Sequence, residues 1–451
     1  MADTMLNLDT ISTLYRAHIA HLSQRYGQTL TALGYAALVL DAGTLQPKSR
    51  FDDQDWPFRR APGFAHWLPL VAPGSFVVVV PGERPLLAWH QPDSFWEGPP
   101  TPERTDFAAE MEVKPFATLG QVRDRVPLGS VAVIAETAQR AHDLVGHGVC
   151  NPSELVAALD ELRVHKTAYE VACLTEANGR AAAGHDAARQ AFAAGGMSEL
   201  QIHLRYLHAT AQDDPETPYK NIVALGPHAA TLHHIAYGKS DPGRQAESLL
   251  LDAGATCLGY HADITRTWTR GSGAALDTFA QLVTAVDRVQ LQLCAQIALG
   301  VPYETLHDSA HFNIGCVLKE AGLVHGGPDE LVSKDITFAF FPHGLGHALG
   351  LQTHDVGCAK IRPRPDNPYL RNTRLIDAGQ VFTIEPGLYF IDGLLRPLRQ
   401  GPHSRLVNWP LVDQLAPFGG IRIEDDVVVC GGAQGHLNLT RTVMPQGGGA
   451  A

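Results

Sequence analysis

Four carboxylate side chains in the second half of the chain lie at the ends of apolar runs or interrupt them. An apolar run leads into Asp252, and Asp263 opens a second short run after a glycine-containing turn, so a hairpin would bring both carboxylates to one point. Glu385 and Glu424 each interrupt another apolar run. Because an unpaired carboxylate on a core strand is costly, these side chains need a cation or hydrogen-bond donors.

Three histidines, His343, His347 and His354, fall among glycines in the segment 341–357, which carries almost no charge. A lone histidine is more often a packed core residue than a ligand, but three histidines this close together favour a functional site. The glycines allow close backbone approaches that other residues forbid. The spacing is not HExxH, so the helical zinc motif is disfavoured.

Together these motifs supply two aspartates, two glutamates and at least one histidine. Four carboxylates that converge in a core cannot all stay ionised without positive charge between them. Two divalent ions about 3.5–4 Å apart would neutralise them and hold a bridging hydroxide as the nucleophile at neutral pH. Oxygen-rich ligation with one imidazole suits manganese or cobalt, with zinc and iron as further options.

Each motif also has a purely structural interpretation. Aspartate beside glycine is commonly a turn or cap residue, which would explain Asp252 and Asp263 singly. Arg422 could form a salt bridge with Glu424 and so explain that buried charge. The set of motifs is far more specific than any one of them, and we therefore predict a two-metal hydrolase.

The elements that must position these residues follow the pattern of an α+β protein. Helical stretches are expected at 277–298 and 306–322. The Gly- and Ala-rich tail at 446–451 is expected to be disordered. Four apolar runs alternate with polar loops and predict strands in antiparallel arrangements: 221–225, 248–252, 381–384 and 427–430.

The first half of the chain predicts a smaller domain with a mixed sheet and a long helix over residues 8–32. The Ala-, Leu- and Glu-rich segment 152–194 predicts two helices, and we place a boundary inside it. This gives an N-terminal α/β domain of residues 1–163 and a catalytic domain of residues 164–451. Apolar runs broken by Gly and Pro predict the strands of the smaller domain: 35–40, 76–80, 85–89 and 131–134.

Composition narrows the class of protein. The 451 residues are 45% hydrophobic and 18% charged, which is ordinary for a soluble globular chain of two or three domains. The formal net charge of −12 leaves no basic excess for phosphates, so no nucleic-acid partner is expected. Seven scattered cysteines without a CxxC spacing, and no apolar signal core or membrane-length run, predict a cytoplasmic protein with no membrane partner.

The motif segments resemble those of the pita-bread metallopeptidases and, within that family, those of the Xaa-Pro dipeptidases (prolidases) of the bacterial PepQ type. The resemblance covers roughly residues 221–429. It implies an α+β chain with a C-terminal pita-bread (creatinase/aminopeptidase) fold, a smaller N-terminal domain and a homodimeric assembly. Four segments carry it in the family's order: LLLDAGATCLGYHADITRTW (249–268), HGLGHALGLQTHDVG (343–357), TIEPGLYFI (383–391) and FGGIRIEDDV (418–427).

A ligand set for two divalent metal ions per subunit follows from this resemblance. Asp263 and Glu424 would bridge the two ions. Asp252 would bind one ion, while His347 and Glu385 would bind the other. Manganese is the expected metal, and cobalt or zinc could replace it.

The resemblance also implies substrate-side histidines. His343 and His354 match the family's histidines that are thought to bind the scissile carbonyl and stabilise the developing oxyanion. His233 matches another substrate-side histidine when counted from Asn221. His234 is its rival, because the loop that follows can differ in length.

Three further side chains match substrate-binding positions of the family. Arg371 matches an arginine associated with the substrate's free C-terminal carboxylate, and its alternative is a solvated surface residue. Arg422 matches an arginine beside the bridging glutamate, where it would orient a ligand. Trp96, in QPDSFWEG (91–98), matches a segment whose aromatic residue reaches the neighbouring subunit's active site, and its alternative is plain packing.

These matches imply hydrolysis of Xaa-Pro dipeptides, with Glu385 carrying a proton to the leaving imide nitrogen. The nearest rival is an Xaa-Pro aminopeptidase acting on longer peptides, and the segments LRNTR (370–374) and FIDGLLRP (390–397) favour the dipeptidase. Organophosphate hydrolysis is expected as a side activity, because the same nucleophile suits phosphorus. A non-catalytic pita-bread binding protein is disfavoured, because all five ligand positions are kept.

Overall fold

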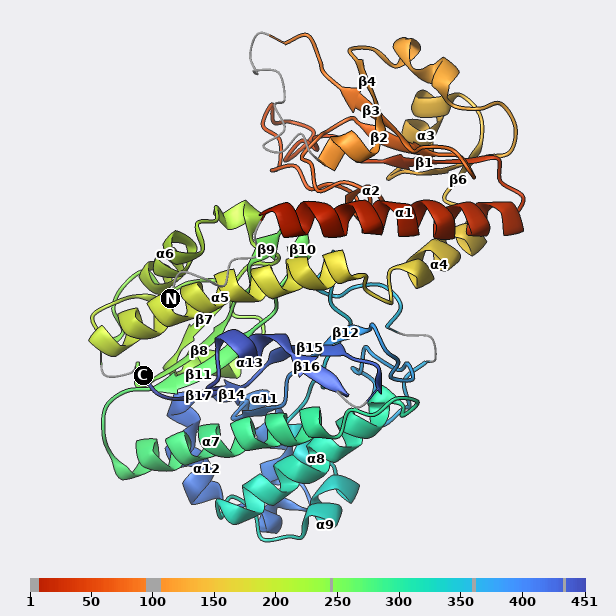
Figure 1. Ribbon diagram of the computed structural model, residues 1–451. Coiled ribbons are helices and arrows are strands. Elements are labelled where there is room, and N and C mark those ends of the chain that lie inside the picture. Colours follow the sequence, from red (N-terminus) through yellow and green to blue (C-terminus); the bar gives the residue numbers. More distant parts are fainter. Residues whose placement is uncertain (1–7, 95–106, 244–245, 359–361, 433–434) are drawn as a thin grey trace. The chain divides into compact units, whose positions relative to one another are not determined.

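The computed structural model describes residues 8–94, 107–243, 246–358, 362–432 and 435–451 (Figure 1). The chain divides into two compact units between Ala172 and Cys173. This division lies inside the long helix α5 (Ala168–Ala194), and the boundary expected after residue 163 falls in the turn between α4 (Ser153–Leu162) and α5. Among the described residues, no helix is long and apolar enough to cross a membrane.

The N-terminal unit is built on a mixed six-stranded sheet in the order β4-β3-β2-β1-β5-β6. Strand β1 pairs antiparallel with β2 and parallel with β5, which confirms the predicted mixed sheet. Its expected helix and strands are present as α1 (Leu8–Ala32), β1 (Ala37–Asp41), β2 (Phe76–Val79), β3 (Leu86–His90) and β5 (Val131–Ile134). The remaining elements are α2 (Pro62–Ala65), α3 (Ala138–Val145), β4 (Glu112–Phe116) and β6 (Val149–Cys150).

The C-terminal unit holds a four-stranded and a three-stranded sheet, and the four candidate carboxylate ligands lie in or beside their strands. The first has the order β17-β11-β8-β7, with β7 (Ile222–Leu225), β8 (Ser248–Asp252), β11 (Thr265–Thr269) and β17 (Gly448–Ala450). The second has the order β12-β15-β16, with β12 (Val381–Ile384), β15 (Asp425–Val429) and β16 (His436–Asn438). Two further antiparallel pairs are the hairpin of β9 (Thr256–Cys257) with β10 (Tyr260–His261), and β13 (Gly387–Tyr389) with β14 (Gly420–Arg422), which are joined through helices.

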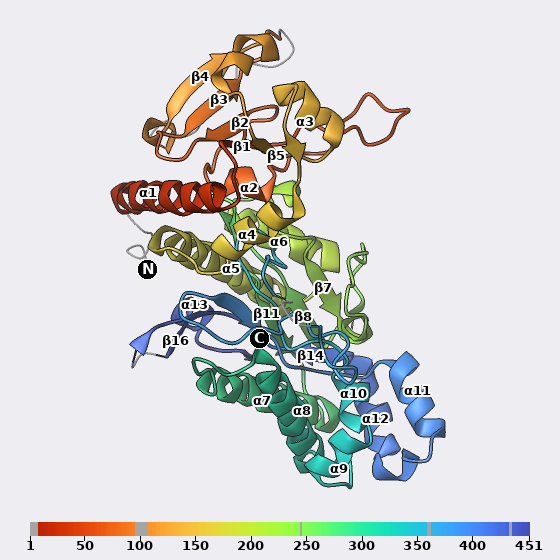
Figure 2. The ribbon, with the colours of Figure 1, turned by 90° about the vertical axis from the view of Figure 1, so that its right-hand side faces the viewer.

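Helices lie on both faces of these strands, as two views of the C-terminal unit show (Figures 1 and 2). One layer contains α5 and α6 (Glu199–Thr210), and the opposite layer contains α7 (Ala274–Ala295) and α8 (Tyr303–Glu320). The predicted helices at 277–298 and 306–322 correspond to α7 and α8. The shorter helices are α9 (Pro328–Ser333), α10 (Ile336–Phe340), α11 (Asp392–Gln400), α12 (Trp409–Leu415) and α13 (Leu439–Val443).

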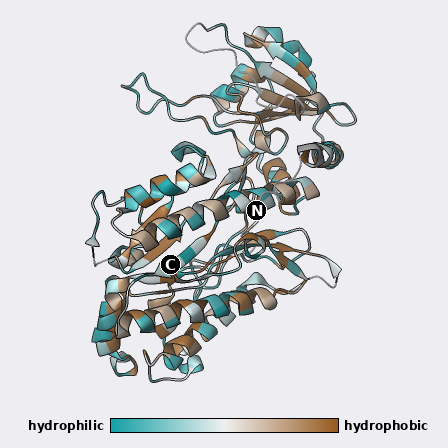
Figure 3. Cartoon of the chain, turned by 60° about the vertical axis from the view of Figure 1, so that its left-hand side comes forward, coloured by the Kyte–Doolittle hydropathy of each residue, from teal (hydrophilic) through white to brown (hydrophobic). Residues whose placement is uncertain are grey.

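Successive apolar side chains of β7 and β8 point to opposite faces of the sheet, so each face packs against its own layer. Val223 and Leu249 pack into the cluster formed with α5 and α6, whereas Ile222 and Leu250 face the opposite side. This period of two buries both faces of the sheet, as expected for a sheet with helices on both sides. Brown segments, which mark hydrophobic residues, lie along strands between the helix layers (Figure 3).

The expectation of a disordered tail is wrong. Residues 448–450 form β17, which pairs parallel with β11, and Ala451 N donates to Thr269 O at 2.9 Å. The reason is the small size of the tail residues. A Cβ added to Gly448 would lie 2.2 Å from Thr267 O, so glycine permits a backbone approach that a larger residue would prevent.

Candidate metal centre

Strands β8 and β11 bring the two aspartates together. Their antiparallel register sets Asp252, the last residue of β8, opposite Thr265, the first residue of β11, and Asp263 lies just before that strand. The Tyr219 hydroxyl oxygen lies 2.7 Å from Oδ1 of Asp252 and 2.5 Å from Oδ1 of Asp263, and its one proton can be donated to either carboxylate. Both carboxylates are therefore within reach of one hydroxyl group.

The glycine-rich loop after α10 places His347 against strand β12. Thr383 N donates to His347 O at 2.9 Å, and His347 N donates to Thr383 Oγ1 at 3.1 Å. A Cβ at Gly346 would lie 2.2 Å from Thr383 O, so this close approach requires glycine. The contact sets the His347 imidazole beside Glu385, with 3.6 Å between Nε2 and Oε1.

Glu424 lies between β14 and β15 and completes the cluster. Its backbone N donates to Thr265 O at 3.0 Å, and Thr265 Oγ1 donates to its Oε2 at 2.6 Å. His347 Nε2 lies 3.4 Å from Asp263 Oδ2 and 4.0 Å from Glu424 Oε1. One ligand atom from each of Asp263, His347 and Glu424 lies within 4.8 Å of the others, a spacing at which one cation can bind all three.

The charges of this cluster are poorly compensated by the protein alone. Burial, followed by the neighbouring carboxylates, raises the pKa of Glu424 well above its ordinary value and that of Glu385 to about 7. Burial would lower the pKa of His347, but the hydrogen bond with Asp263 and the charge of Glu385 outweigh it and raise the pKa to about 9. Four carboxylates therefore share the charges of one imidazole, that of His347, and one guanidinium group, that of Arg422.

This surplus of buried negative charge shows that the residues fit divalent metal ions. A set of buried carboxylates that repel one another is stabilised when divalent cations lie between them. Oxygen donors with one imidazole match manganese or cobalt better than they match a thiolate-type zinc site. The structure brings all five predicted ligands into this cluster: Asp252, Asp263, His347, Glu385 and Glu424.

Arg422 lies behind Asp252. Its Nη2 donates to Asp252 Oδ2 at 2.6 Å, its Nη1 to the Tyr389 hydroxyl at 2.9 Å and its Nε to Thr265 Oγ1 at 3.1 Å. The salt bridge with Glu424 that the sequence allowed is thus formed with Asp252 instead. The guanidinium group is buried and holds Asp252, a candidate ligand, in place.

Both ring nitrogens of His343 are engaged. Nδ1 lies 2.9 Å from Gly344 O, and Nε2 lies 2.8 Å from the Tyr389 hydroxyl. Because a carbonyl oxygen only accepts, Nδ1 donates to Gly344, and Nε2 of the neutral ring accepts from Tyr389. Burial and the charge of Arg422 lower the pKa of His343 to about 3, which keeps the ring neutral.

His354 and Arg371 lie on the exposed side of the cluster. The His354 ring meets that of His347 edge to face, with 4.4 Å between the centroids. Burial, followed by the charges of His347 and Arg371, lowers the pKa of His354 to about 4. Trp96, the third predicted substrate contact, lies outside the described residues.

The two rival histidines point to different places. His233 is exposed and is near enough to His343 and His354 to contribute to the lowering of their pKa values, after larger causes. His234 is turned towards Glu199, with 2.9 Å between Nε2 and Oε2. This geometry supports His233, rather than its neighbour, as the substrate-side histidine.

Sequence reasoning did not single out the hydroxyl groups that hold the ligands. Thr265 and Thr383 each bond a candidate ligand, and Tyr219 bonds two. The two threonines could have been predicted from the sequence. Each lies two residues from a candidate ligand and would therefore share a face with it on an extended strand. Tyr219 lies far from its partners in the chain, so only the fold identifies it.

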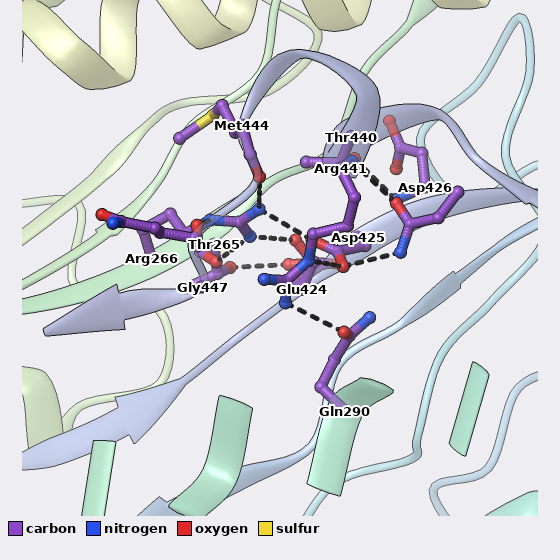
Figure 4. A network of polar contacts seen from close by, with 12 residues as sticks. Thr265, Arg266, Gln290, Glu424, Asp425, Asp426, Thr440, Arg441, Met444 and Gly447 are labelled. Carbon is purple, nitrogen blue, oxygen red and sulfur yellow. Dashed lines mark hydrogen bonds and ion pairs between the residues drawn. The ribbon is translucent and has the colours of Figure 1, made fainter. Parts of the chain in front are cut away.

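A buried ion network fixes the strands behind Glu424 (Figure 4). Arg266 donates from Nη1 to Glu424 O at 2.8 Å and from Nε to Gln446 O at 2.9 Å. Its Nη2 lies 2.8 Å from Asp425 Oδ1, and Asp425 also accepts from Arg441 Nε at 2.5 Å. The backbone of a ligand is thereby tied to the C-terminal segment.

Comparison with known proteins gives the class of this chain. Residues 172–430 match Metallopeptidase family M24, and residues 13–160 match the Xaa-Pro dipeptidase, N-terminal domain. The chain belongs to metallopeptidase family M24. It is 43% identical over 443 residues to the Xaa-Pro dipeptidase of Marinobacter nauticus, covering 97% of this chain and 99% of that protein. It is 40% identical over 434 residues to the Xaa-Pro dipeptidase of Pseudoalteromonas atlantica, covering 94% and 97%.

The predicted membership of the pita-bread metallopeptidases, in the branch with a PepQ-type N-terminal domain, is therefore confirmed. Solved structures agree on the fold. The aminopeptidase PepP of Pseudomonas aeruginosa superposes with a TM-score of 0.71 at 22% identity, covering 95% of both chains. The zinc-substituted aminopeptidase P of Escherichia coli in complex with product superposes with a TM-score of 0.71 at 21% identity, again covering 95% of both chains.

Proposed function

We propose that the protein is an Xaa-Pro dipeptidase that hydrolyses the peptide bond before a C-terminal proline. The observation that carries this proposal is the buried cluster of carboxylates around His347, with His233, His354 and Arg371 on its exposed side. The relatives that align over nearly the whole chain carry the same name. The homodimer stays a prediction of the resemblance, and the cytoplasmic location stays a prediction of the sequence.

Two divalent ions, with manganese as the proposed metal, would be held by the five clustered ligands. When bound, such ions supply positive charge that makes a water molecule nucleophilic near neutral pH and polarises the attacked carbonyl group. Tyr219 and Arg422 would keep Asp252 in position for this binding, because ligands are oriented by the groups hydrogen-bonded to them.

Glu385 is proposed to move the proton. It would accept a proton from the attacking water and deliver it to the proline nitrogen, because a tertiary amide nitrogen leaves poorly until it is protonated. His233 and His354, which are exposed, would donate hydrogen bonds to the substrate where negative charge develops. His343 has both nitrogens engaged and would position the loop beside Glu385, 3.8 Å away.

Arg371 would restrict the enzyme to dipeptides. An exposed guanidinium group beside His354 can bind the free carboxylate of a C-terminal proline through charge-assisted hydrogen bonds. A longer peptide carries its carboxylate elsewhere, so it would lose this contact. The rival function, an aminopeptidase for longer Xaa-Pro peptides, would not need it.

Metal analysis and chelation test the two-metal proposal. The reconstituted protein is expected to hold about two manganese ions per chain and to lose activity on Ala-Pro in a chelator. Less than one bound ion per chain, with activity unchanged in the chelator, would refute a dinuclear centre.

Comparison of Ala-Pro with Ala-Pro-Ala tests the substrate. Ala-Pro should be cleaved with the higher kcat/KM, and Arg371→Ala should lower that value about 10- to 100-fold because a hydrogen bond to a charged group is lost. Arg362→Ala is the matched control, since it removes an exposed arginine from the same loop. Faster cleavage of Ala-Pro-Ala would favour the aminopeptidase instead.

A phosphotriesterase side reaction is also proposed, because the same nucleophile can attack phosphorus. Release of p-nitrophenol from a p-nitrophenyl phosphotriester measures it directly. The rate should fall with chelation in parallel with the dipeptidase rate if both reactions use one centre.

A further inference from the structure

A second group of potential metal ligands lies apart from the candidate ligands of the metal centre. Glu199 is the first residue of α6, His228 lies in a short 3-10 helix (Gly226–Ala230), and His234 follows in the next loop. His228 Nδ1 lies 2.7 Å from Glu199 Oε1, and His234 Nε2 lies 2.9 Å from Oε2. Neither Glu199 nor His228 takes part in the proposed hydrolysis.

The carboxylate of Glu199 is held in place by the backbone. Leu225 N donates to Oε1 at 2.9 Å, and Gly238 N donates to Oε2 at 2.7 Å. Each carboxylate oxygen has two lone pairs, so each has one lone pair left that faces the histidines and can bind a cation. Metal-binding carboxylates are characteristically oriented by such bonds, and Glu199 is only 2% exposed.

The two imidazoles are arranged side by side on the open side of this carboxylate. Their rings stack with 4.4 Å between centroids and 29° between planes. One ligand atom from each of Glu199, His228 and His234 lies within 4.8 Å of the other two. The side chain of His228 is half exposed and that of His234 is 11% exposed, so a cation can enter from solvent and keep water in its remaining positions.

We infer that Glu199, His228 and His234 form a binding site for a third divalent cation. Two imidazoles with one carboxylate and open positions form a ligand set that zinc uses in proteins, and copper, nickel and iron also suit imidazole. The oxygen-rich dinuclear centre suits manganese, so the two sites differ in chemistry. To bind, each imidazole carries its proton on the ring nitrogen that faces away from Glu199.

A cation bound to Glu199, His228 and His234 would restrict the position of His233. His234 is adjacent to His233, and Gly238 N, which closes the same loop, is bonded to Glu199. A cation at this site fixes the loop at His228 and His234 and so limits the positions that His233 can adopt. This consequence rests on the proposed function, whereas the binding site itself does not.

Zinc binding to the manganese-loaded holoenzyme tests the inference. The protein is dialysed against zinc in excess manganese, and both metals are counted per chain by mass spectrometry. Wild type is expected to keep its manganese and take up about one further zinc ion per chain. The manganese count reports on the dinuclear centre separately, so failure of one proposal is distinguishable from failure of the other.

His228→Asn is the informative variant, because asparagine keeps a hydrogen-bond donor for Glu199 but supplies no imidazole. It should weaken zinc binding at least about 10-fold without changing the manganese count. His208→Asn, at an exposed position of α6, is the matched control and should bind zinc as wild type does. Glu199→Gln, which keeps the shape but loses the charge, should also weaken zinc binding.

Two results would overturn the inference. Wild type that gains no zinc beyond the ions that replace its manganese has no third site. Equal zinc affinity of wild type and His228→Asn would mean that the zinc binds elsewhere.

Discussion

At the scale of single residues, the candidate centre depends on groups that hold the ligands as well as on the ligands. Tyr219 is the clearest case, because its one hydroxyl lies within hydrogen-bonding distance of Asp252 and Asp263. Burial and the charges of these aspartates raise the pKa of Tyr219 well above its ordinary value, so it stays a protonated donor. It fixes the direction in which both carboxylates present their other oxygens.

Tyr219→Phe should therefore weaken metal binding about 10- to 100-fold, which is the usual cost of losing a group that orients a ligand. The ring stays and the packing is conserved, so the fold should be unaffected. Titration of the metal-free protein with manganese measures the affinity, and circular dichroism checks the fold. Unchanged manganese affinity would show that the hydroxyl does not orient the aspartates.

The pH dependence of the free energy of unfolding tests whether folding lowers the pKa of Glu199. Burial would raise the pKa of Glu199, but hydrogen bonds from Leu225 N and Gly238 N and from His234 and His228 outweigh it and lower the pKa. A carboxyl group whose pKa is lowered by folding stabilises the fold above its unfolded pKa of about 4.3. That contribution is lost as the pH falls through the folded pKa.

Glu199→Gln should therefore lower the free energy of unfolding by about 1–3 kcal/mol at pH 7, because the amide leaves donors unsatisfied. The difference from wild type should shrink as the pH falls below about 4. Urea unfolding in a chelator, at several pH values, measures both effects without a contribution from bound metal. A difference that grows towards low pH would contradict the sign of the pKa shift.

At the scale of elements, β11 links the candidate centre to the C-terminal tail. Thr265 at its start bonds Glu424, and its later residues pair with β17. Gly448 is the critical position, because an added Cβ would lie 2.2 Å from Thr267 O and 2.9 Å from Val283 Cγ1. The tail can pair only if residue 448 stays small.

Gly448→Ala should accordingly destabilise the protein by about 1–3 kcal/mol, the usual cost of overpacking. Gly393→Ala in α11 is the matched control, since nothing lies within 4 Å of its added Cβ, and it should be neutral or slightly stabilising. The thermal midpoint of unfolding, measured for each variant in saturating manganese, shows whether only Gly448→Ala destabilises the protein. Equal midpoints would mean that β17 contributes nothing to stability.

Elements with a strong internal pattern could be predicted from the sequence, and elements defined by their neighbours could not. Strand β8 is an apolar run that ends at a charged residue, and its bounds are those expected. Strand β17 consists of Gly448, Gly449 and Ala450, which give no strand signal. It exists because an edge of β11 is available to pair with, and no local pattern records that.

At the scale of the whole molecule, the same distinction holds for the site. The four carboxylates among the candidate ligands could be singled out because charge beside an apolar run is conspicuous in a sequence, and His347 because it lies with two other histidines in a glycine-rich segment. The sequence predicts Arg422 beside Glu424, and the structure shows it bonded to Asp252. Tyr219 could not be predicted, because its contacts join residues far apart in the chain. The group formed by Glu199, His228 and His234 also could not be predicted from the sequence. The fold brings α6 next to the segment after β7, and the two lie apart in the chain.

All of the candidate ligands lie in the C-terminal unit, and this predicts where metal removal acts. Without cations, the buried carboxylates repel one another, and binding of a metal at about 100 times its Kd would stabilise the fold by about 2.7 kcal/mol per site. Chelation should therefore raise the rate of amide hydrogen exchange in β8, β11, β12 and β15, which carry or adjoin the ligands.

Strands β1, β2 and β5 of the N-terminal unit contain no ligand, and their exchange should be unchanged. Hydrogen-exchange mass spectrometry of the same sample with manganese and with chelator measures both sets of strands at once, so each serves as the control for the other. Faster exchange throughout the chain would mean that metal binding stabilises the protein as one cooperative unit. Faster exchange confined to the ligand-bearing strands would mean that the two units open independently, and that the metals determine the stability of the catalytic unit alone.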